Sequence, residues 1–102
     1  MIIRSKAPLR LGLAGGGTDL DTYCNKFGGY VLNSTISLYV HCTIEEKDGG
    51  TIVFESTDYN AILEVESQEY LELDGNMDLY KGIYNRIVKD YIHKPLSFTI
   101  SW

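Results

Sequence analysis

Hydrophobic and polar positions alternate most regularly between Ile36 and Glu45. The apolar side chains of this stretch fall at every second position: Ile36, Leu38, Val40, Cys42 and Ile44. A period of two predicts a strand with one buried and one polar face. Asp48-Gly49-Gly50 follows and is typical of a hairpin turn, so we expect residues 51–55 to return as the partner strand.

Weaker alternation predicts further strands on both sides of this segment. Residues 1–13 are apolar around Pro8, which indicates a first strand that is interrupted or shifted at the proline. Residues 61–66 are a further strand candidate and residues 69–73 a weaker one. At the end of the sequence, Phe98, Ile100 and Trp102 alternate with small polar residues, which predicts a last strand over residues 96–102.

Two segments show helical periodicity. In the first, Leu20, Tyr23, Cys24 and Phe27 follow the i, i+3, i+4, i+7 pattern, with Thr18 or Asp19 as the capping residue and Gly28-Gly29 at the end. The second helix is expected over residues 79–92, before Pro95. Its predicted apolar face comprises Tyr80, Ile83, Tyr84, Ile87, Val88 and Tyr91.

The elements follow the order β-α-β-β-β-α-β, which predicts an α+β fold with a mixed or antiparallel sheet and two helices. The 102 residues are enough for one domain or part of a larger one. No turn or polar tail follows Trp102 in the last strand. We therefore expect residues 1–102 to be the first part of a longer domain.

Charge excludes some classes of partner. The formal net charge is −5 and the acidic residues gather between Glu45 and Asp78, so a nucleic-acid surface is not expected. The acidic residues from Glu64 to Asp74 indicate a face exposed to solvent. No metal site is expected. The first residues carry three basic side chains and do not form a signal peptide, and no apolar run approaches the ~20 residues of a membrane span. A cytoplasmic protein with reduced cysteines is expected.

The stretch from Ala7 to Cys24, APLRLGLAGGGTDLDTYC, carries the candidate chemistry. Its glycines fit the first half of a P-loop, but Thr18 and Asp19 stand where that loop has lysine and serine or threonine. A carboxylate in place of the lysine would repel a polyphosphate. The dinucleotide pattern G-x-G-x-x-G is also absent. The loop is therefore expected to bind another kind of ligand.

A strand, a glycine turn and a helix start remain, with polar residues on both sides of the turn. Glycines allow a ligand to approach the backbone closely. The Asp19 carboxylate can accept hydrogen bonds from sugar hydroxyls, and Arg10 can serve a phosphate or a reacting hydroxyl. The alternative is a plain strand-to-helix turn in which Asp19 only caps the helix.

These residues resemble the opening motif of the GHMP kinases. Against the galactokinase form AP-G-R-V-N-L-I-G-E-H-T-D, matches fall at Ala7, Pro8, Arg10, Leu13, Gly15, Thr18 and Asp19. Gly16 and Gly17 replace the glutamate and histidine. The GGGTD version is similar to the sugar-1-kinase branch that includes heptose-phosphate kinases, as are Gly28 to Asn33 and the segment Asn85 to Val88.

The resemblance implies ATP-dependent phosphorylation of a sugar hydroxyl, the anomeric one of a heptose 7-phosphate. It assigns Arg10 a catalytic and substrate-binding role, places Gly15, Gly16, Gly17, Thr18 and Asp19 around the sugar, and offers Tyr30 and Asn33 as further lining residues. ATP and Mg²⁺ would bind mainly to a later motif, P-x-x-x-G-L-G-S-S, which is expected after the last strand and is absent here.

Residues 1–102 alone are therefore expected to be inactive. The alternative function is a non-catalytic module that binds a small molecule or a protein through the same glycine loop. The sequence beyond Trp102 would distinguish the two hypotheses.

Overall fold

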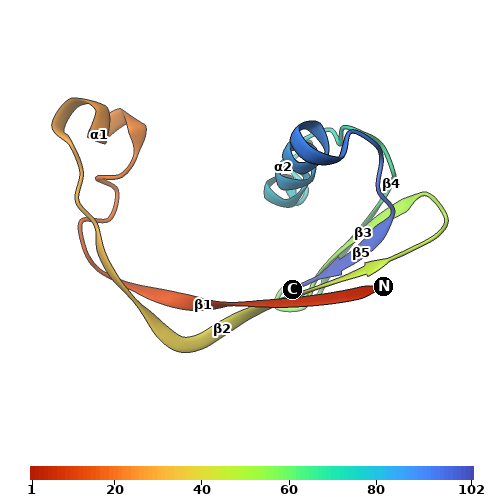
Figure 1. Cartoon of the computed structure of the whole chain (residues 1–102), viewed down its shortest axis with the longest axis horizontal. Coiled ribbons are helices and arrows are strands. Elements are labelled where there is room, and N and C mark those ends of the chain that lie inside the picture. Colours follow the sequence, from red (N-terminus) through yellow and green to blue (C-terminus); the bar gives the residue numbers. More distant parts are fainter. The chain divides into compact units, whose positions relative to one another are not determined.

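The computed structural model describes all 102 residues and confirms the α+β fold. The elements, in chain order, are β1 (Ile2–Ala14), α1 (Asp21–Phe27), β2 (Leu32–Glu46), β3 (Thr51–Ser56), β4 (Ala61–Glu66), α2 (Asp78–Ile87), a π-helical turn η1 (Val88–Ile92) and β5 (Phe98–Ser101). Figure 1 shows them along the chain. They form two compact units, one of residues 6–40 and one of residues 1–5 and 41–102.

The five strands form one mixed sheet in the order β1-β2-β5-β3-β4. β5 lies between β2 and β3, antiparallel to the first and parallel to the second. The predicted hairpin of β2 and β3 is therefore wrong. Neighbouring strands lie about 4.8 Å apart, so the turn at residues 47–50 spans the width of two strand spacings. The turn residues alone could not show that β5, about fifty residues later in the sequence, would lie between β2 and β3.

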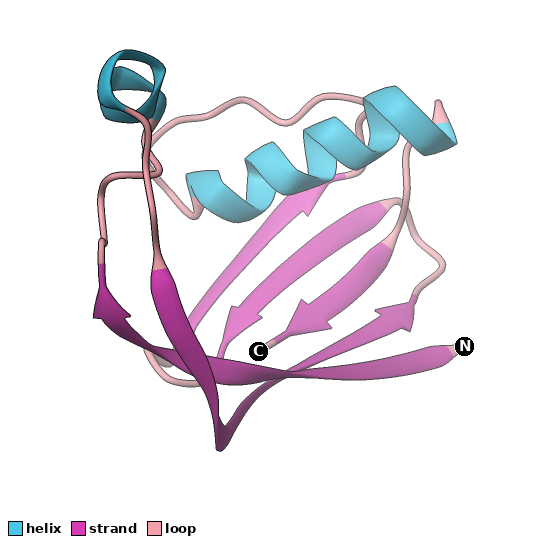
Figure 2. Cartoon of the chain, turned by 60° about the vertical axis from the view of Figure 1, so that its left-hand side comes forward, coloured by secondary structure: helices cyan, strands magenta, loops and turns pink.

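Figure 2 shows that α2 covers one face of β3, β4 and β5, and the core of the 41–102 unit lies between this helix and these strands. Its buried hydrophobic residues are Ile52, Phe54, Leu71, Tyr84 and Val88. In β3 every second side chain is buried. Burying each large apolar side chain contributes roughly 2 kcal/mol.

The buried face of α2 differs from the predicted one. Tyr84 and Val88 are buried, but Ile83, Ile87 and Tyr91 are exposed. The regular helix ends at Ile87, and the wider π-helical turn follows. The predicted face was too broad because only a narrow stripe of the helix contacts the sheet.

The segment between β4 and α2 contains no strand, although residues 69–73 predicted one. The side chain of Asn85 takes over the pairing, because its Oδ1 accepts from the Leu71 N–H at 2.7 Å and its Nδ2 donates to the Leu71 carbonyl at 2.8 Å. Leu71 is only 4% exposed. The side-chain amide of Asn85, on α2, therefore supplies the hydrogen bonds that the Leu71 backbone would have made in the predicted strand.

The buried cation of this unit is Lys81, which is 3% exposed and lies 2.6 Å from the Asp74 carboxylate. The hydrogen bond from Lys81, together with the backbone N–H of Asn76, lowers the pKa of Asp74. A lowered folded pKa means that the pair stabilises the fold above the ordinary aspartate value and loses this effect as pH falls.

We therefore expect the melting temperature of the wild-type chain to fall between about pH 5 and pH 3 more steeply than that of the Asp74→Asn variant. Melting curves followed by circular dichroism at several pH values check this. Equal slopes for the two proteins would contradict the role given to the pair.

In the 6–40 unit, β1 continues through Pro8 without interruption, contrary to the prediction. β1 is the first strand of the sheet order, so one of its sides is an edge. An edge position tolerates a residue without a backbone N–H. The glycine loop of this unit lies between β1 and α1.

Candidate functional site

The loop between β1 and α1 spans residues 15–20 and has the strand-turn-helix arrangement expected from the sequence (Figure 1). Thr18 closes its turn. The Thr18 N–H donates to the Gly15 carbonyl at 3.1 Å, and the Thr18 hydroxyl lies 2.7 Å from the same oxygen. The hydroxyl is also 3.0 Å from the carbonyl oxygen of Tyr30. Thr18 therefore joins the glycine turn to the segment that follows α1.

Close backbone packing strengthens this connection. A Cβ on Gly15 would lie 1.9 Å from the Tyr30 carbonyl oxygen, and a Cβ on Gly29 would lie 2.1 Å from the Thr18 carbonyl oxygen. Both distances are far below a van der Waals contact, so only glycine fits at these two positions. The Gly28-Gly29 pair was interpreted as a helix end only. Its second function is to let the two segments touch.

The three consecutive glycines differ in what the fold requires of them. Gly15 has φ +83° and no room for a side chain, and Gly17 has φ +88°, which favours glycine although the space beside it is open. Gly16 has neither restriction. The backbone therefore explains two of the glycines but not Gly16.

We expect Gly15→Ala to destabilise the protein strongly and Gly16→Ala to leave its melting temperature nearly unchanged. The first substitution forces a backbone shift, while the second adds a methyl group to open space. Melting curves of both variants check this, and Gly16→Ala serves as the matched control. An equally stable Gly15→Ala variant would show that the turn can relax.

The carboxylate of Asp19 does not cap α1. The N-cap residue is Leu20, which makes no side-chain hydrogen bond, and α1 starts at Asp21. Asp19 is exposed and takes part in none of the ion pairs. The alternative in which Asp19 only caps the helix is therefore wrong. Its carboxylate is free to accept hydrogen bonds from a ligand.

The remaining predicted site residues occupy exposed positions of the same unit. Arg10 lies on β1 outside all ion pairs, and Asn33 lies near the start of β2. The Tyr30 side chain is 93% exposed. Hydrogen bonds bring together Gly15, Thr18 and Tyr30, but they do not join Arg10, Asp19 or Asn33 to this group. The site thus has a hydrogen-bonded turn, and charged side chains that take part in no ion pair lie near this turn in the sequence.

Sequence reasoning overlooked a second set of polar residues, at the carboxyl ends of β3 and β5. The side-chain oxygen of Ser56 is buried without a hydrogen-bond partner. The hydroxyl of Thr57 lies 2.7 Å from the Trp102 carbonyl oxygen. The available signal was the alternation of Ile52, Phe54 and Ser56, which places a serine at the last inward position of β3.

Comparisons with known proteins give the context of this site. No protein-family model matches the chain. A curated D-glycero-alpha-D-manno-heptose 7-phosphate kinase from Campylobacter jejuni is 59% identical over 98 residues, which cover 96% of this chain and 29% of that protein.

Two solved structures are similar in fold. The crystal structure of a putative sugar kinase from Campylobacter jejuni has a TM-score of 0.80 at 58% identity, over 98% of this chain and 30% of the other. That of a D-glycero-D-manno-heptose 1-phosphate kinase from Bacteroides thetaiotaomicron has a TM-score of 0.83 at 50% identity, over 99% and 33%. The chain spans no more than a third of the length of these relatives. The resemblance to sugar kinases that the sequence indicated is thus confirmed.

Proposed function

We propose that residues 1–102 form the N-terminal, sugar-binding part of an ATP-dependent sugar kinase of the GHMP type. The proposed reaction is phosphorylation of the anomeric hydroxyl of a heptose 7-phosphate. The observation that carries the proposal is the 59% identity to a heptose 7-phosphate kinase over nearly the whole chain. The free carboxylate of Asp19 beside a glycine turn supports it, because sugar hydroxyls need such acceptors.

The residues of this chain would bind and orient the sugar. Asp19 would accept hydrogen bonds from sugar hydroxyls, and the bare Gly16 would let the sugar approach the backbone. Thr18 would stabilise the turn through its hydrogen bonds to the carbonyl oxygens of Gly15 and Tyr30. Arg10 would lie near the reacting oxygen, where its charge stabilises the negative charge that develops during phosphoryl transfer. Tyr30 and Asn33 would also line the sugar-binding site.

We infer that ATP and Mg²⁺ bind mainly to residues outside this chain. No group of three or more His, Cys, Asp or Glu side chains could hold a metal ion. The glycine loop carries Asp19 where a phosphate loop needs a cation. We therefore assign ATP and its metal mainly to residues outside 1–102, and the catalytic base as well.

No helix of the structure has the length and apolar character needed to cross a membrane. The proposed partner is a small sugar phosphate, and we infer a cytoplasmic enzyme because such substrates are metabolites of that compartment.

The proposed function is tested with the full-length protein, ATP and D-glycero-D-manno-heptose 7-phosphate, with unphosphorylated heptose and galactose as comparison substrates. We expect ADP release to be fastest with the 7-phosphate. Phosphorus NMR of the product should show a second phosphate coupled to the anomeric proton. Product phosphorylated elsewhere on the ring would contradict the anomeric position, and no turnover with any sugar would favour the non-catalytic binding module.

A further inference from the structure

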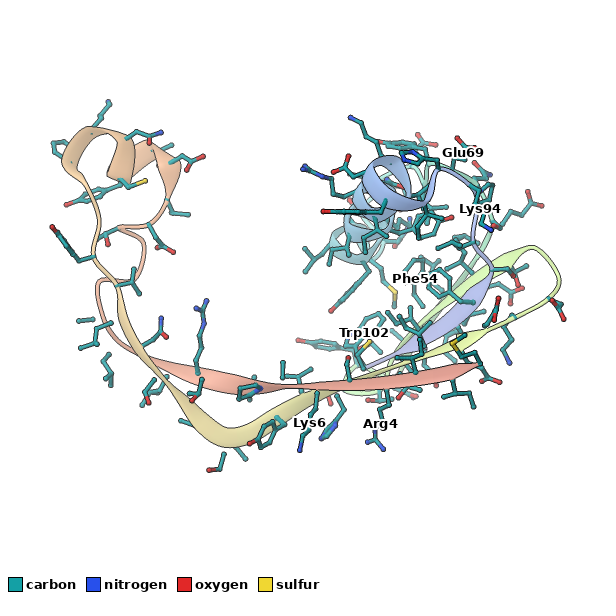
Figure 3. All side chains as sticks on the ribbon, in the orientation of Figure 1. Arg4, Lys6, Phe54, Glu69, Lys94 and Trp102 are labelled. Atoms are coloured by element: carbon teal, nitrogen blue, oxygen red, sulfur yellow. The ribbon has the colours of Figure 1, made fainter.

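A cavity of about 530 Å³ lies beside the carboxyl end of α2 in the 41–102 unit. This volume is typical of pockets that hold small molecules. Glu69 and Tyr70 line the cavity from the segment between β4 and α2, and Figure 3 shows Glu69 beside the helix. Arg86, Lys89 and His93 line it from α2, from η1 and from the residue after η1. The cavity shares no residue with the glycine loop.

Hydrogen bonds on both sides of residues 69–70 fix this part of the cavity against α2. The Tyr84 hydroxyl donates to the Gln68 carbonyl at 2.7 Å. On the other side, the Asn85 amide makes two hydrogen bonds to the Leu71 backbone, at 2.7 and 2.8 Å. The cavity is therefore formed in the absence of a ligand, which lowers the entropy that binding would cost.

The helical part of the cavity departs from regular geometry. The η1 segment is a π-helical turn, and the His93 N–H that follows it donates to the Val88 carbonyl at 2.7 Å. His93 has φ +60°, a left-handed conformation that is uncommon for residues other than glycine. π-Helical turns and left-handed side-chain-bearing residues are both frequent at functional sites. Here the two features coincide at residues that line one cavity.

The charges that line the cavity are positive on balance. Arg86 and Lys89 are cations and Glu69 is the one acid among the lining residues, although the whole chain has a net charge of −5. Lys89, His93 and Glu69 take part in no ion pair, whereas Arg86 pairs with Asp90. Guanidinium and ammonium groups bind phosphate, so the cavity favours a phosphate-bearing ligand.

We propose that this cavity binds a phosphate monoester carried on a polyhydroxylated ring, the chemistry of a sugar phosphate. Arg86, Lys89 and His93 bind the phosphate. The Glu69 carboxylate accepts hydrogen bonds from ring hydroxyls, and the Tyr70 ring, which is 63% exposed, packs against the ring of the ligand. This site is additional to the proposed function and does not rest on it.

The test titrates the full-length protein with glucose 6-phosphate by calorimetry, without ATP. Glucose and inorganic phosphate are the two parts of this probe, and adenosine 5′-phosphate is a phosphate monoester that also carries a base. We expect glucose 6-phosphate to bind about tenfold more tightly than either part alone, because only the whole probe reaches both the cations and Glu69.

Lys89→Gln and His93→Asn should each weaken binding of the probe about fivefold, the effect of one lost charged contact at an exposed position. Asparagine accepts the left-handed backbone at position 93. Lys94→Gln is the matched control, because Lys94 is an exposed lysine that takes part in no ion pair and does not line the cavity. It should bind like wild type, and so should Asp19→Ala in the glycine loop.

Four results would overturn the proposal. Absence of binding, or equal weakening in Lys94→Gln, would show that the cavity is not a site. Binding that is lost in Asp19→Ala and kept in Lys89→Gln would place the probe at the glycine loop. Tighter binding of adenosine 5′-phosphate would contradict a sugar as the ligand. A lower melting temperature of Lys89→Gln with unchanged binding would mean that this cation only offsets the negative end of the helix dipole.

Discussion

Residues 1–102 produced on their own should transfer no measurable phosphate from ATP to heptose 7-phosphate. Phosphoryl transfer depends almost entirely on positioning and on stabilising charge around the phosphates. The glycine loop carries a carboxylate, that of Asp19, where those charges would need a cation. A coupled assay of ADP release, with the full-length protein as the positive control, measures this.

Folding of the shorter chain is checked in the same sample. The closely packed, tilted rings of Tyr80 and Trp102 should give a near-ultraviolet circular dichroism signal when the 41–102 unit is folded. Folded chain that turns over both substrates would refute the assignment of ATP to residues beyond Trp102.

Arg10→Ala in the full-length enzyme should lower kcat by roughly one to three powers of ten, because a charged group that contacts the transition state typically contributes this much. The KM for the sugar phosphate should change much less. Arg10 is exposed and in no ion pair, so its loss should not affect folding. Steady-state kinetics and melting curves measure both effects.

Arg4→Ala is the matched control, because Arg4 is an exposed arginine of the same strand. It points to the face of the sheet away from α2 (Figure 3). We expect its kcat to match wild type. Equal losses in the two variants would mean that the strand needs positive charge in general and that Arg10 has no catalytic role.

The fold could be predicted largely from local patterns. The turn residues before β3, the strand candidate at residues 61–66 and the glycines after α1 placed these elements correctly. The sheet order could not be predicted, because β5 enters between β2 and β3 from the far end of the sequence. The buried Lys81 was also missed, since only the structure shows that Asp74 lies beside it.

The local structure of the glycine loop could be predicted from the sequence only in part. The sequence gathered Gly15 to Asp19 in one loop. It could not show that Gly15 and Gly29 allow two backbone segments to touch, because this contact joins residues on both sides of α1. Nor could it separate a capping role of Asp19 from a free carboxylate, because the two differ by a shift of one residue in the helix start.

The central claim is that the glycine loop binds the sugar, and calorimetric titration of the full-length protein with heptose 7-phosphate tests it most directly. Wild type is compared with Asp19→Ala and with Asp21→Ala, which removes the exposed acid two residues later, in the first turn of α1. We expect Asp19→Ala to weaken binding by about tenfold or more, the loss of a charged hydrogen-bond acceptor, without lowering the melting temperature. Asp21→Ala should bind like wild type. Sugar binding that is unchanged in a folded Asp19→Ala variant, or weakened equally in both variants, would contradict the claim.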